Sequence, residues 1–298
     1  MISNNSADMQ REMDLCREMI ENRLSELLAE TNTKYVTLIE SMRYSLLSGG
    51  KRVRAILCMK FCEATGGKLE DALDAACAIE MLHAYTLIHD DLPSMDGDDT
   101  RRGKPSNHIA YGEFTAILAG DALQATAFET LTKSDLPANA IVEMVKTLAQ
   151  VAGPHGVCAG QYLDLSGEGR QLTIEEIKEI YSLKTSALIS AATRLGVIAG
   201  GGTPEQVDAA DEYAQAIGLA FQVRDDILDC TATTEELGKP IGSDVENEKS
   251  TFASLLGIEV SEKIVNEETK NAVNAIEGKF ENVDFLAWIA AILAERTN

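Results

Sequence analysis

The sequence predicts an all-α protein, and three observations support that prediction. Ala, Leu, Glu and Ile dominate long stretches, while aromatic residues make up only 5% of the 298 residues, a composition that favours helix. Apolar residues recur at helical spacing, and no stretch of useful length alternates apolar with polar residues as a strand would. No Ser-, Gly- or Pro-rich linker divides the chain. We therefore predict a single domain over residues 1–298, folded as one large helical bundle.

The individual helices are expected between turn-forming residues. An apolar stripe over residues 15–28 predicts the first, and residues 34–39 fit a strand or a helix start equally well. A further helix follows Gly50 and ends at Gly66, because glycine readily adopts the left-handed conformation that closes helices. Residues 187–199 are apolar around most of the circumference, so we expect them at the centre of the bundle. The other predicted helices span residues 69–92, 113–133, 138–152, 173–200, 204–231 and 262–295.

Charge and cysteine content narrow the possible functions. Lys and Arg number 26 against 48 Asp and Glu, so the net charge is −22. This charge argues against nucleic acid and anionic membranes as partners, yet it permits a phosphorylated ligand where cations or metals cluster. The six cysteines form no C-x-x-C pair, which indicates free thiols in a reducing cytoplasm. No run of 18 apolar residues predicts a membrane span, and the polar N-terminal stretch lacks a signal-peptide pattern.

Two aspartate clusters are the first candidate functional residues. Each ends an apolar helical segment, which favours a metal site over the alternative of solvated surface or helix caps. Asp225 and Asp229 lie four residues apart and therefore share one helix face. Crowded carboxylates need cations, and Mg²⁺ fits because it prefers carboxylate oxygens and usually shares them with phosphates. The clusters comprise Asp90, Asp91 and Asp96, and Asp225, Asp226 and Asp229.

Cationic residues lie close to these clusters in the sequence. Lys51 and Arg54 are three apart, and we expect them on one face of a helix start, where free backbone N–H groups also attract anions. His83 lies two turns before Asp90 on the same helix face. Charge balancing of the acidic runs and an ordinary helix histidine remain alternatives. The other candidates are Arg101, Arg102, Lys184, Thr185, Lys239 and Lys249.

Two other acidic motifs are considered and discounted. Residues 96–100 read D-x-D-x-T, the loop of aspartyl-phosphate phosphatases, but that loop must follow a buried strand and none is predicted here. An EF-hand loop aligned on Gly97 would place Leu92 and Gly103 at its first and twelfth positions, where neither can bind Ca²⁺.

Taken in order, the motifs resemble the trans-isoprenyl diphosphate synthase family, and most of all its bacterial farnesyl diphosphate synthases. The resemblance covers about residues 44–256 and implies an all-α bundle around a deep central cavity, usually homodimeric. It rests on GGKRVR at 49–54, DDLPSMDGDDTRRGKPSNH at 90–108, GQYLDL at 160–165, KTSAL at 184–188, FQVRDDILD at 221–229, LGKPIGSD at 237–244 and KST at 249–251.

The resemblance implies a role for each matching position. The six aspartates would hold an allylic diphosphate through Mg²⁺, with three ions bound per site. The side chains that would contact this diphosphate are Arg101, Lys184, Thr185, Gln222 and Lys239. Those matching the isopentenyl diphosphate site are Lys51, Arg54, His83 and Arg102. The residues expected to be catalytic are Asp90, Asp91, Asp96, Asp225, Lys184 and Lys239.

The reaction implied is ionisation of the allylic diphosphate, attack by the isopentenyl double bond, and loss of a proton to the released diphosphate. Product length depends on what stops the growing tail. Tyr85 lies five residues before Asp90, which is about 7.5 Å along a helix, and Thr86 beside it is small. A tyrosine there resembles farnesyl synthases, so farnesyl diphosphate is the expected product and geranylgeranyl diphosphate the alternative.

Two further alternatives differ in class. A non-catalytic partner subunit is expected to lose one aspartate cluster, and both are intact in this sequence. A terpene cyclase also ionises a prenyl diphosphate, but it does not need the isopentenyl site formed by Lys51, Arg54 and His83. The sequence therefore favours a prenyltransferase.

Overall fold

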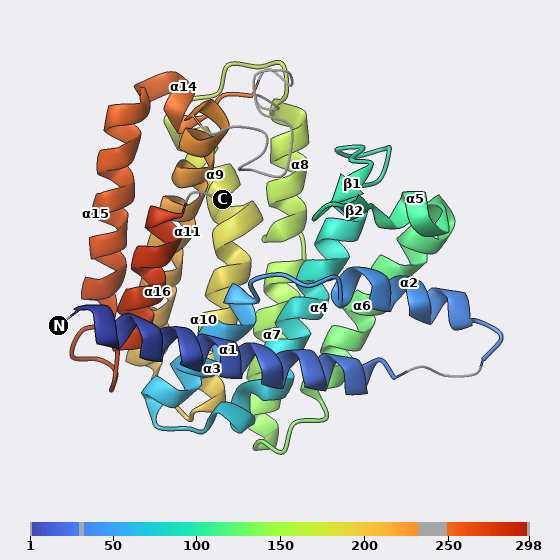
Figure 1. The fold of residues 1–298 in the computed structure, drawn as a ribbon, viewed down its shortest axis with the longest axis horizontal. Coiled ribbons are helices and arrows are strands. Elements are labelled where there is room, and N and C mark those ends of the chain that lie inside the picture. The colour runs from blue at the N-terminus through green and yellow to red at the C-terminus, as the bar shows by residue number, and fades with distance from the viewer. Residues whose placement is uncertain (1, 30–32, 232–248, 297–298) are drawn as a thin grey trace.

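The computed structural model describes residues 2–29, 33–231 and 249–296, and almost all of its elements are helices, as predicted (Figure 1). The α-helices of the first half are α1 (Ile2–Leu27), α2 (Val36–Leu46), α3 (Val53–Thr65), α4 (Leu73–Asp90), α5 (Asn107–Tyr111) and α6 (Glu113–Leu131). Those of the second half are α7 (Ala138–Ala152), α8 (Val157–Gly167), α9 (Ile174–Tyr181), α10 (Ala187–Ala199), α11 (Pro204–Thr231), α14 (Phe252–Leu256), α15 (Ile258–Ile276) and α16 (Asp284–Glu295). A 3₁₀ turn, η1 (Leu69–Ala72), precedes α4, and a π-helical turn, η2 (Ser182–Ser186), joins α9 to α10. None of the described helices is long and apolar enough to cross a membrane.

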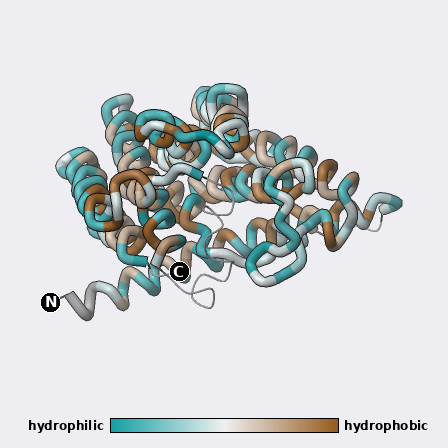
Figure 2. Tube along the Cα trace, turned by 90° about the horizontal axis from the view of Figure 1, so that it is seen from above, coloured by the Kyte–Doolittle hydropathy of each residue, from teal (hydrophilic) through white to brown (hydrophobic). Residues whose placement is uncertain are grey.

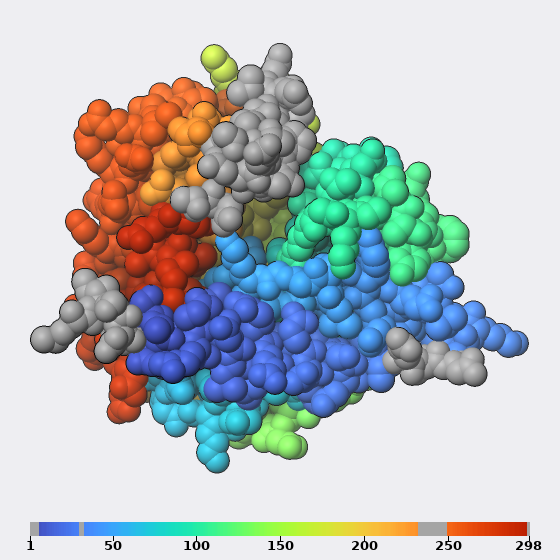
Figure 3. Space-filling view, in the orientation of Figure 1, coloured from blue at the N-terminus to red at the C-terminus, as the bar shows by residue number. Residues whose placement is uncertain are grey.

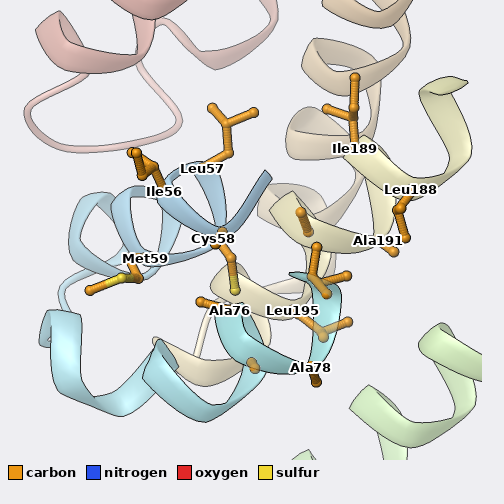
Figure 4. Close-up of a cluster of buried hydrophobic side chains, with 14 of the residues drawn as sticks. Ile56, Leu57, Cys58, Met59, Ala76, Ala78, Leu188, Ile189, Ala191 and Leu195 are labelled. Atoms are coloured by element: carbon orange, nitrogen blue, oxygen red, sulfur yellow. The ribbon is translucent and has the colours of Figure 1, made fainter. Parts of the chain in front are cut away.

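The centre of the bundle is formed by α3, α4 and α10, as the apolar stretch 187–199 predicts. Their side chains interlock in the cluster drawn in Figure 4, where Cys58, Ala76 and Leu195 meet from the three helices. Small residues allow close approach: a Cβ added at Gly196 of α10 would lie 3.0 Å from the carbonyl carbon of Cys58 in α3. One main hydrophobic cluster extends from Met9 in α1 to Leu293 in α16, and a second, smaller cluster includes Ile177 of α9 and Phe252 of α14.

The remaining helices surround this centre. In Figure 1, α1 lies across the front of a set of upright helices, and α2 and α5 project to the right, close to α6. Seen from above, hydrophobic and hydrophilic residues alternate along the helices, as expected when each helix buries one side (Figure 2). The space-filling view shows a hollow in this face, between the surface of α3 and the red surface of α16 (Figure 3).

The structure corrects several predicted elements. The predicted helix 262–295 is wrong as a single element, because the chain breaks between α15 and α16, where Gly278 adopts a left-handed conformation. Residues 34–39 lead into α2 and form no strand. Two short strands that periodicity could not reveal, β1 (Thr100–Arg101) and β2 (Lys104–Pro105), pair as a hairpin after the first aspartate cluster.

Candidate functional site

The first aspartate cluster is built by the abrupt end of α4. Asp90 is the last residue of that helix, and Pro93 prevents its continuation. The chain then turns back, so that the backbone N–H of Asp96 donates to the carbonyl oxygen of Asp90 at 2.9 Å. Burial, with help from Asp96 and Asp91, raises the pKa of Asp90 to about 7, although Lys184 and Arg101 oppose the rise. Burial therefore disfavours the charged form of Asp90, which a cation bound nearby would favour.

Asp91 forms an ion pair with Arg101 of the hairpin. Its buried carboxylate accepts hydrogen bonds from Arg101, whose Nε lies 2.9 and 3.3 Å from the two oxygens and whose Nη2 also contacts Oδ1. Arg101 also reaches Asp98 at 2.9 Å. Asp91 therefore positions Arg101 beside the cluster, and a diphosphate or metal would compete with this ion pair.

The second cluster lies on α11. Gln222, one turn before Asp225, accepts a hydrogen bond at 2.7 Å from the hydroxyl of Thr185 in η2. Asp225 forms an ion pair with Arg296 near the end of the described chain, and the Arg296 guanidinium lies 3.6 Å from the centre of the Phe221 ring. In this state an arginine supplies the positive charge that Asp225 requires.

The other two aspartates of this cluster have different surroundings. The Asp226 carboxylate accepts from the Tyr181 hydroxyl at 2.7 Å and from the backbone N–H of Phe252 at 2.8 Å. Asp229 is 4% exposed, and its Oδ1 has no hydrogen-bond partner among the described residues.

Lys184 connects the two clusters. Its ammonium group lowers the pKa of Asp90, and it shares a cavity of about 200 Å³ with Thr185, Gln222 and Asp225. It donates to Asp164 of α8 at 2.5 Å. Lys249, after the segment outside the described residues, approaches the same Asp164 oxygen at 3.3 Å. Although burial opposes them, the two lysines hold the pKa of Asp164 below its ordinary value.

Asp164 is a site residue to which sequence reasoning assigned no role. Asp164 belongs to the GQYLDL motif, which is the sequence signal that could have identified it. Nothing in the sequence shows that its carboxylate forms ion pairs with both Lys184 and Lys249. Lys239 lies outside the described residues, so its predicted role stays a prediction.

Three of the four predicted isopentenyl-site residues come together. Arg54 Nη1 lies 3.5 Å from His83 Nε2, and the Nε of Arg54 has no hydrogen-bond partner among the described residues. Arg102 donates to the carbonyl oxygen of Gly49. Burial, followed by the charges of Arg54 and Arg102, lowers the pKa of His83 well below its ordinary value. His83 is therefore neutral among a surplus of guanidinium groups, which is suited to an anion.

Lys51 does not share a helix face with Arg54, so that prediction is wrong. Helix α3 begins only at Val53, and Lys51 lies before it. Partial burial and the nearby charge of Arg296 lower the pKa of Lys51, while Asp225 opposes the change, which places Lys51 on the side of the second cluster.

The residue between them, Arg52, is structural. It has a left-handed φ of 52°, is 5% exposed, and pairs with Glu80 at 3.0 Å and Glu21 at 2.7 Å. This buried triad fixes the corner at which Lys51 and Arg54 diverge. No sequence pattern distinguishes Arg52 from the neighbouring cations Lys51 and Arg54.

The two residues predicted to limit product length lie on α4. Tyr85 is half-buried, with its hydroxyl 3.8 Å from the sulfur of Cys158 in α8 and its ring edge-on to His89 at 4.9 Å. Thr86 donates to the carbonyl oxygen of His83 at 2.8 Å. Tyr85 thus lies between α4 and α8, on the N-terminal side of Asp90.

The donor set fits Mg²⁺ held jointly with a diphosphate. No group of three or more His, Cys, Asp or Glu side chains poised for a metal exists within the parts of the chain that the structure covers. Mg²⁺ does not need one, because it is commonly bound through one or two carboxylates together with substrate phosphates and water. Asp90, Asp96 and Asp225 could supply hard oxygen ligands of the kind that Mg²⁺ prefers.

Comparisons with known proteins agree with this arrangement. Residues 36–293 match the polyprenyl synthetase family. A geranylgeranyl diphosphate synthase of Cyanophora paradoxa is 45% identical over 88% of this chain and 89% of its own length. Geranylgeranyl pyrophosphate synthase 3 of Arabidopsis thaliana, a chloroplastic protein, is 49% identical over 82% of this chain and 69% of its own. The crystal structure of an FPP/GFPP synthase from Zymomonas mobilis superposes with a TM-score of 0.88 at 33% identity, covering 97% of this chain and 99% of that one. The fold and these similarities together show that the chain belongs to the polyprenyl synthetase family of trans-isoprenyl diphosphate synthases.

Proposed function

We propose that this prenyltransferase condenses isopentenyl diphosphate with allylic diphosphates and extends them to geranylgeranyl diphosphate. The observation that supports the reaction is the position of Lys184. It lies within the electrostatic reach of Asp90 and Asp96 and in the same cavity as Asp225. One diphosphate bound at Lys184 would therefore be within reach of carboxylates from both clusters, as a metal-bridged leaving group requires.

The allylic diphosphate is held by side chains that stabilise its departure. Lys184, Thr185 and Gln222 face the cavity and can contact its oxygens. Each close charge pair contributes about 4 kcal/mol at an effective dielectric near 20, so several of them favour ionisation substantially. Mg²⁺, when bound at the aspartates, supplies further positive charge to the leaving group. The ion count of three per site stays a prediction.

The second substrate is assigned to the guanidinium groups beside α4. The charges of Arg54 and Arg102 both lower the pKa of His83. His83 and Arg102 line a cavity between α2, α4 and the hairpin. Neutral His83 can accept from Arg54 and leave the remaining donors for an isopentenyl diphosphate. The proton lost after condensation is assigned to the released diphosphate.

Two observations disagree about the product. The curated relatives described above are geranylgeranyl diphosphate synthases, and they favour the twenty-carbon product over the fifteen-carbon product that the sequence pattern predicts. Farnesyl diphosphate remains the second candidate because of one residue. The Tyr85 ring, held by Cys158 and His89, is bulky enough to stop a growing tail on the N-terminal side of Asp90.

Product analysis tests both proposals. Purified protein is incubated with Mg²⁺, isopentenyl diphosphate and, separately, dimethylallyl, geranyl or farnesyl diphosphate, and the hydrolysed alcohols are identified by mass spectrometry. Geranylgeraniol from all three primers supports the main proposal. Farnesol that is not extended supports the Tyr85 limit, and Tyr85→Ala should then lengthen the product. Asp90→Ala and Asp225→Ala should lose most turnover while remaining folded, and wild-type rates in either would refute the metal assignment.

We also propose a homodimer. The outward face of α6 exposes Phe114, Ile117 and Leu118 by 74%, 43% and 50%, at the i, i+3, i+4 spacing of one helix face. Ile109 of the adjacent α5 is 52% exposed. An apolar face of this kind normally marks a protein contact. A second copy of the chain is the occupant that the resemblance implies.

The remaining alternatives carry less support. A non-catalytic partner subunit is not favoured, because both aspartate clusters are intact, and Lys184 lowers the pKa of Asp90 while it lines a cavity together with Asp225. A reducing compartment, the cytoplasm, is proposed because Cys16, Cys58, Cys62 and Cys77 lie buried in the core as free thiols.

A further inference from the structure

A short stretch that leads into α14, here termed the return segment (Lys249–Phe252), is held by contacts at each position. Lys249 contacts Asp164 at 3.3 Å. The Ser250 hydroxyl accepts from the backbone N–H of Leu172 at 3.1 Å, and Thr251 caps α14 by accepting from Ser254 N. At its end, the N–H of fully buried Phe252 donates to Asp226 at 2.8 Å.

Asp226 is the residue of α11 to which the return segment is hydrogen-bonded. It is 3% exposed, and each carboxylate oxygen accepts a hydrogen bond, Oδ1 from Tyr181 and Oδ2 from Phe252. The two donors are themselves in contact, because the Tyr181 and Phe252 rings stack with centroids 5.9 Å apart. Asp226 therefore joins α9, α11 and the return segment, whereas its neighbour Asp225 pairs with the side chain of Arg296.

This attachment limits where Lys249 can lie. Phe252 lies three positions after Lys249, and a chain spans at most about 3.6 Å per residue. With Phe252 held by Asp226, the Lys249 ammonium falls within reach of Asp164, the same carboxylate that binds Lys184. Lys249 also acts on Asp96 electrostatically, so the return segment brings a cation to the cavity between the two clusters.

We propose that Asp226 is a positioning residue, not a metal ligand: it anchors the return segment and thereby holds Lys249 at Asp164 beside the substrate cavity. The inference rests on the proposed function, which assigns that cavity to the substrate. It departs from the role that the sequence resemblance implies for Asp226. Its two hydrogen bonds run to protein donors, which is the arrangement of a structural carboxylate.

The first test separates an anchor from a ligand in metal-free protein. Asp226→Ala leaves the Tyr181 hydroxyl and the Phe252 N–H without an acceptor, so the midpoint of thermal unfolding in EDTA should fall by several °C. Asp226→Asn should recover most of that loss, because its amide oxygen can accept from Phe252 and its N–H₂ can donate to Tyr181. A midpoint that is unchanged or raised in Asp226→Ala would overturn the anchor, since removing a mere ligand relieves repulsion between carboxylates.

The second test measures metal affinity without turnover. Titration calorimetry follows binding of inorganic diphosphate at increasing Mg²⁺, with Asp225→Asn as the matched control on the same helix. Asp226→Asn should shift the required Mg²⁺ concentration less than threefold, and Asp225→Asn more than tenfold. Equal shifts in the two variants would overturn the proposal. If the unchanged protein binds no Mg²⁺-diphosphate, the proposed function fails, while the unfolding test still decides the anchor.

The third test asks whether Asp226 acts through Lys249. In a double-mutant cycle, the loss of kcat in Asp226→Ala plus Lys249→Met should be no greater than the larger single loss. Asp226→Asn should restore kcat, because its side-chain amide can keep both hydrogen bonds and thereby the position of Lys249. If kcat of the double variant falls by the product of the two single-variant factors, the proposed connection between Asp226 and Lys249 is overturned.

Discussion

Single aspartates of the two clusters meet different environments, although the sequence presents them as alike. Asp91 is neutralised by Arg101 and Asp225 by Arg296, and Asp226 is occupied by protein donors. Burial raises the pKa of Asp90 to about 7, and burial also raises the pKa of Asp91, although Arg101 opposes that rise. Burial therefore disfavours the charged form of both carboxylates at the end of α4.

Asp90 should lower the stability of the metal-free protein at high pH. Its pKa is raised from 3.8 to about 7 in the fold, so the folded state holds this proton more tightly than the unfolded chain. Its contribution to the free energy of unfolding is greatest below about pH 4 and is lost as the pH rises to about 7. We expect Asp90→Asn to have a higher unfolding midpoint than the wild type in EDTA at pH 8, with a difference that shrinks toward pH 4. A variant less stable than wild type at pH 8 would contradict this explanation.

At the scale of elements, the π-helical turn η2 decides where Lys184 and Thr185 point. It lies between α8 and α11, and a glycine permits close contact on each side. A Cβ at Gly160 of α8 would lie 2.7 Å from the carbonyl carbon of Leu183, and one at Gly218 of α11 would lie 2.9 Å from the Cα of Ser186. The glycine of the GQYLDL motif is thus required by packing against η2, and π-turns inside helices often mark functional sites.

Gly160→Ala should therefore impair turnover more than folding. The added methyl group meets backbone atoms of η2 that cannot rotate away, so Lys184 must shift. A displacement near 1 Å can lower kcat about 100-fold, and overpacking typically costs about 1–3 kcal/mol of stability. Steady-state kinetics and thermal unfolding check this prediction. Ser166→Ala, an exposed change on the same helix, is the control and should behave as wild type in both measurements.

At the scale of the whole molecule, the exposed face of α6 predicts a dimer. Phe114→Glu combined with Leu118→Glu places two charges on that face and should yield a particle of the 32.2 kDa chain mass by light scattering, against twice that mass for the wild type. Leu15→Glu, at a 52% exposed apolar residue of α1, is the matched control and should remain dimeric. A monomeric wild type would refute the assembly.

Much of the architecture was predictable because helical periodicity is a local property. The helix over 204–231 and that over 138–152 have the bounds that were expected, and the all-apolar stretch in α10 lies at the core. The break between α15 and α16 was missed, since amphipathic periodicity continues on both sides of it. The hairpin after Asp99 was missed because two-residue strands have no period to detect.

The sequence by itself determined the helical fold, the free thiols, the family and the set of acidic and basic residues, because composition, spacing and motif order are properties of the chain alone. Only the tertiary structure decided which charges face one another. It separated Lys51 from Arg54, made Arg52 a buried structural cation, and brought Asp164 between two lysines that are 65 residues apart in the chain, Lys184 and Lys249. Electrostatic energy depends on distance and burial in space, and neither follows from position along the chain.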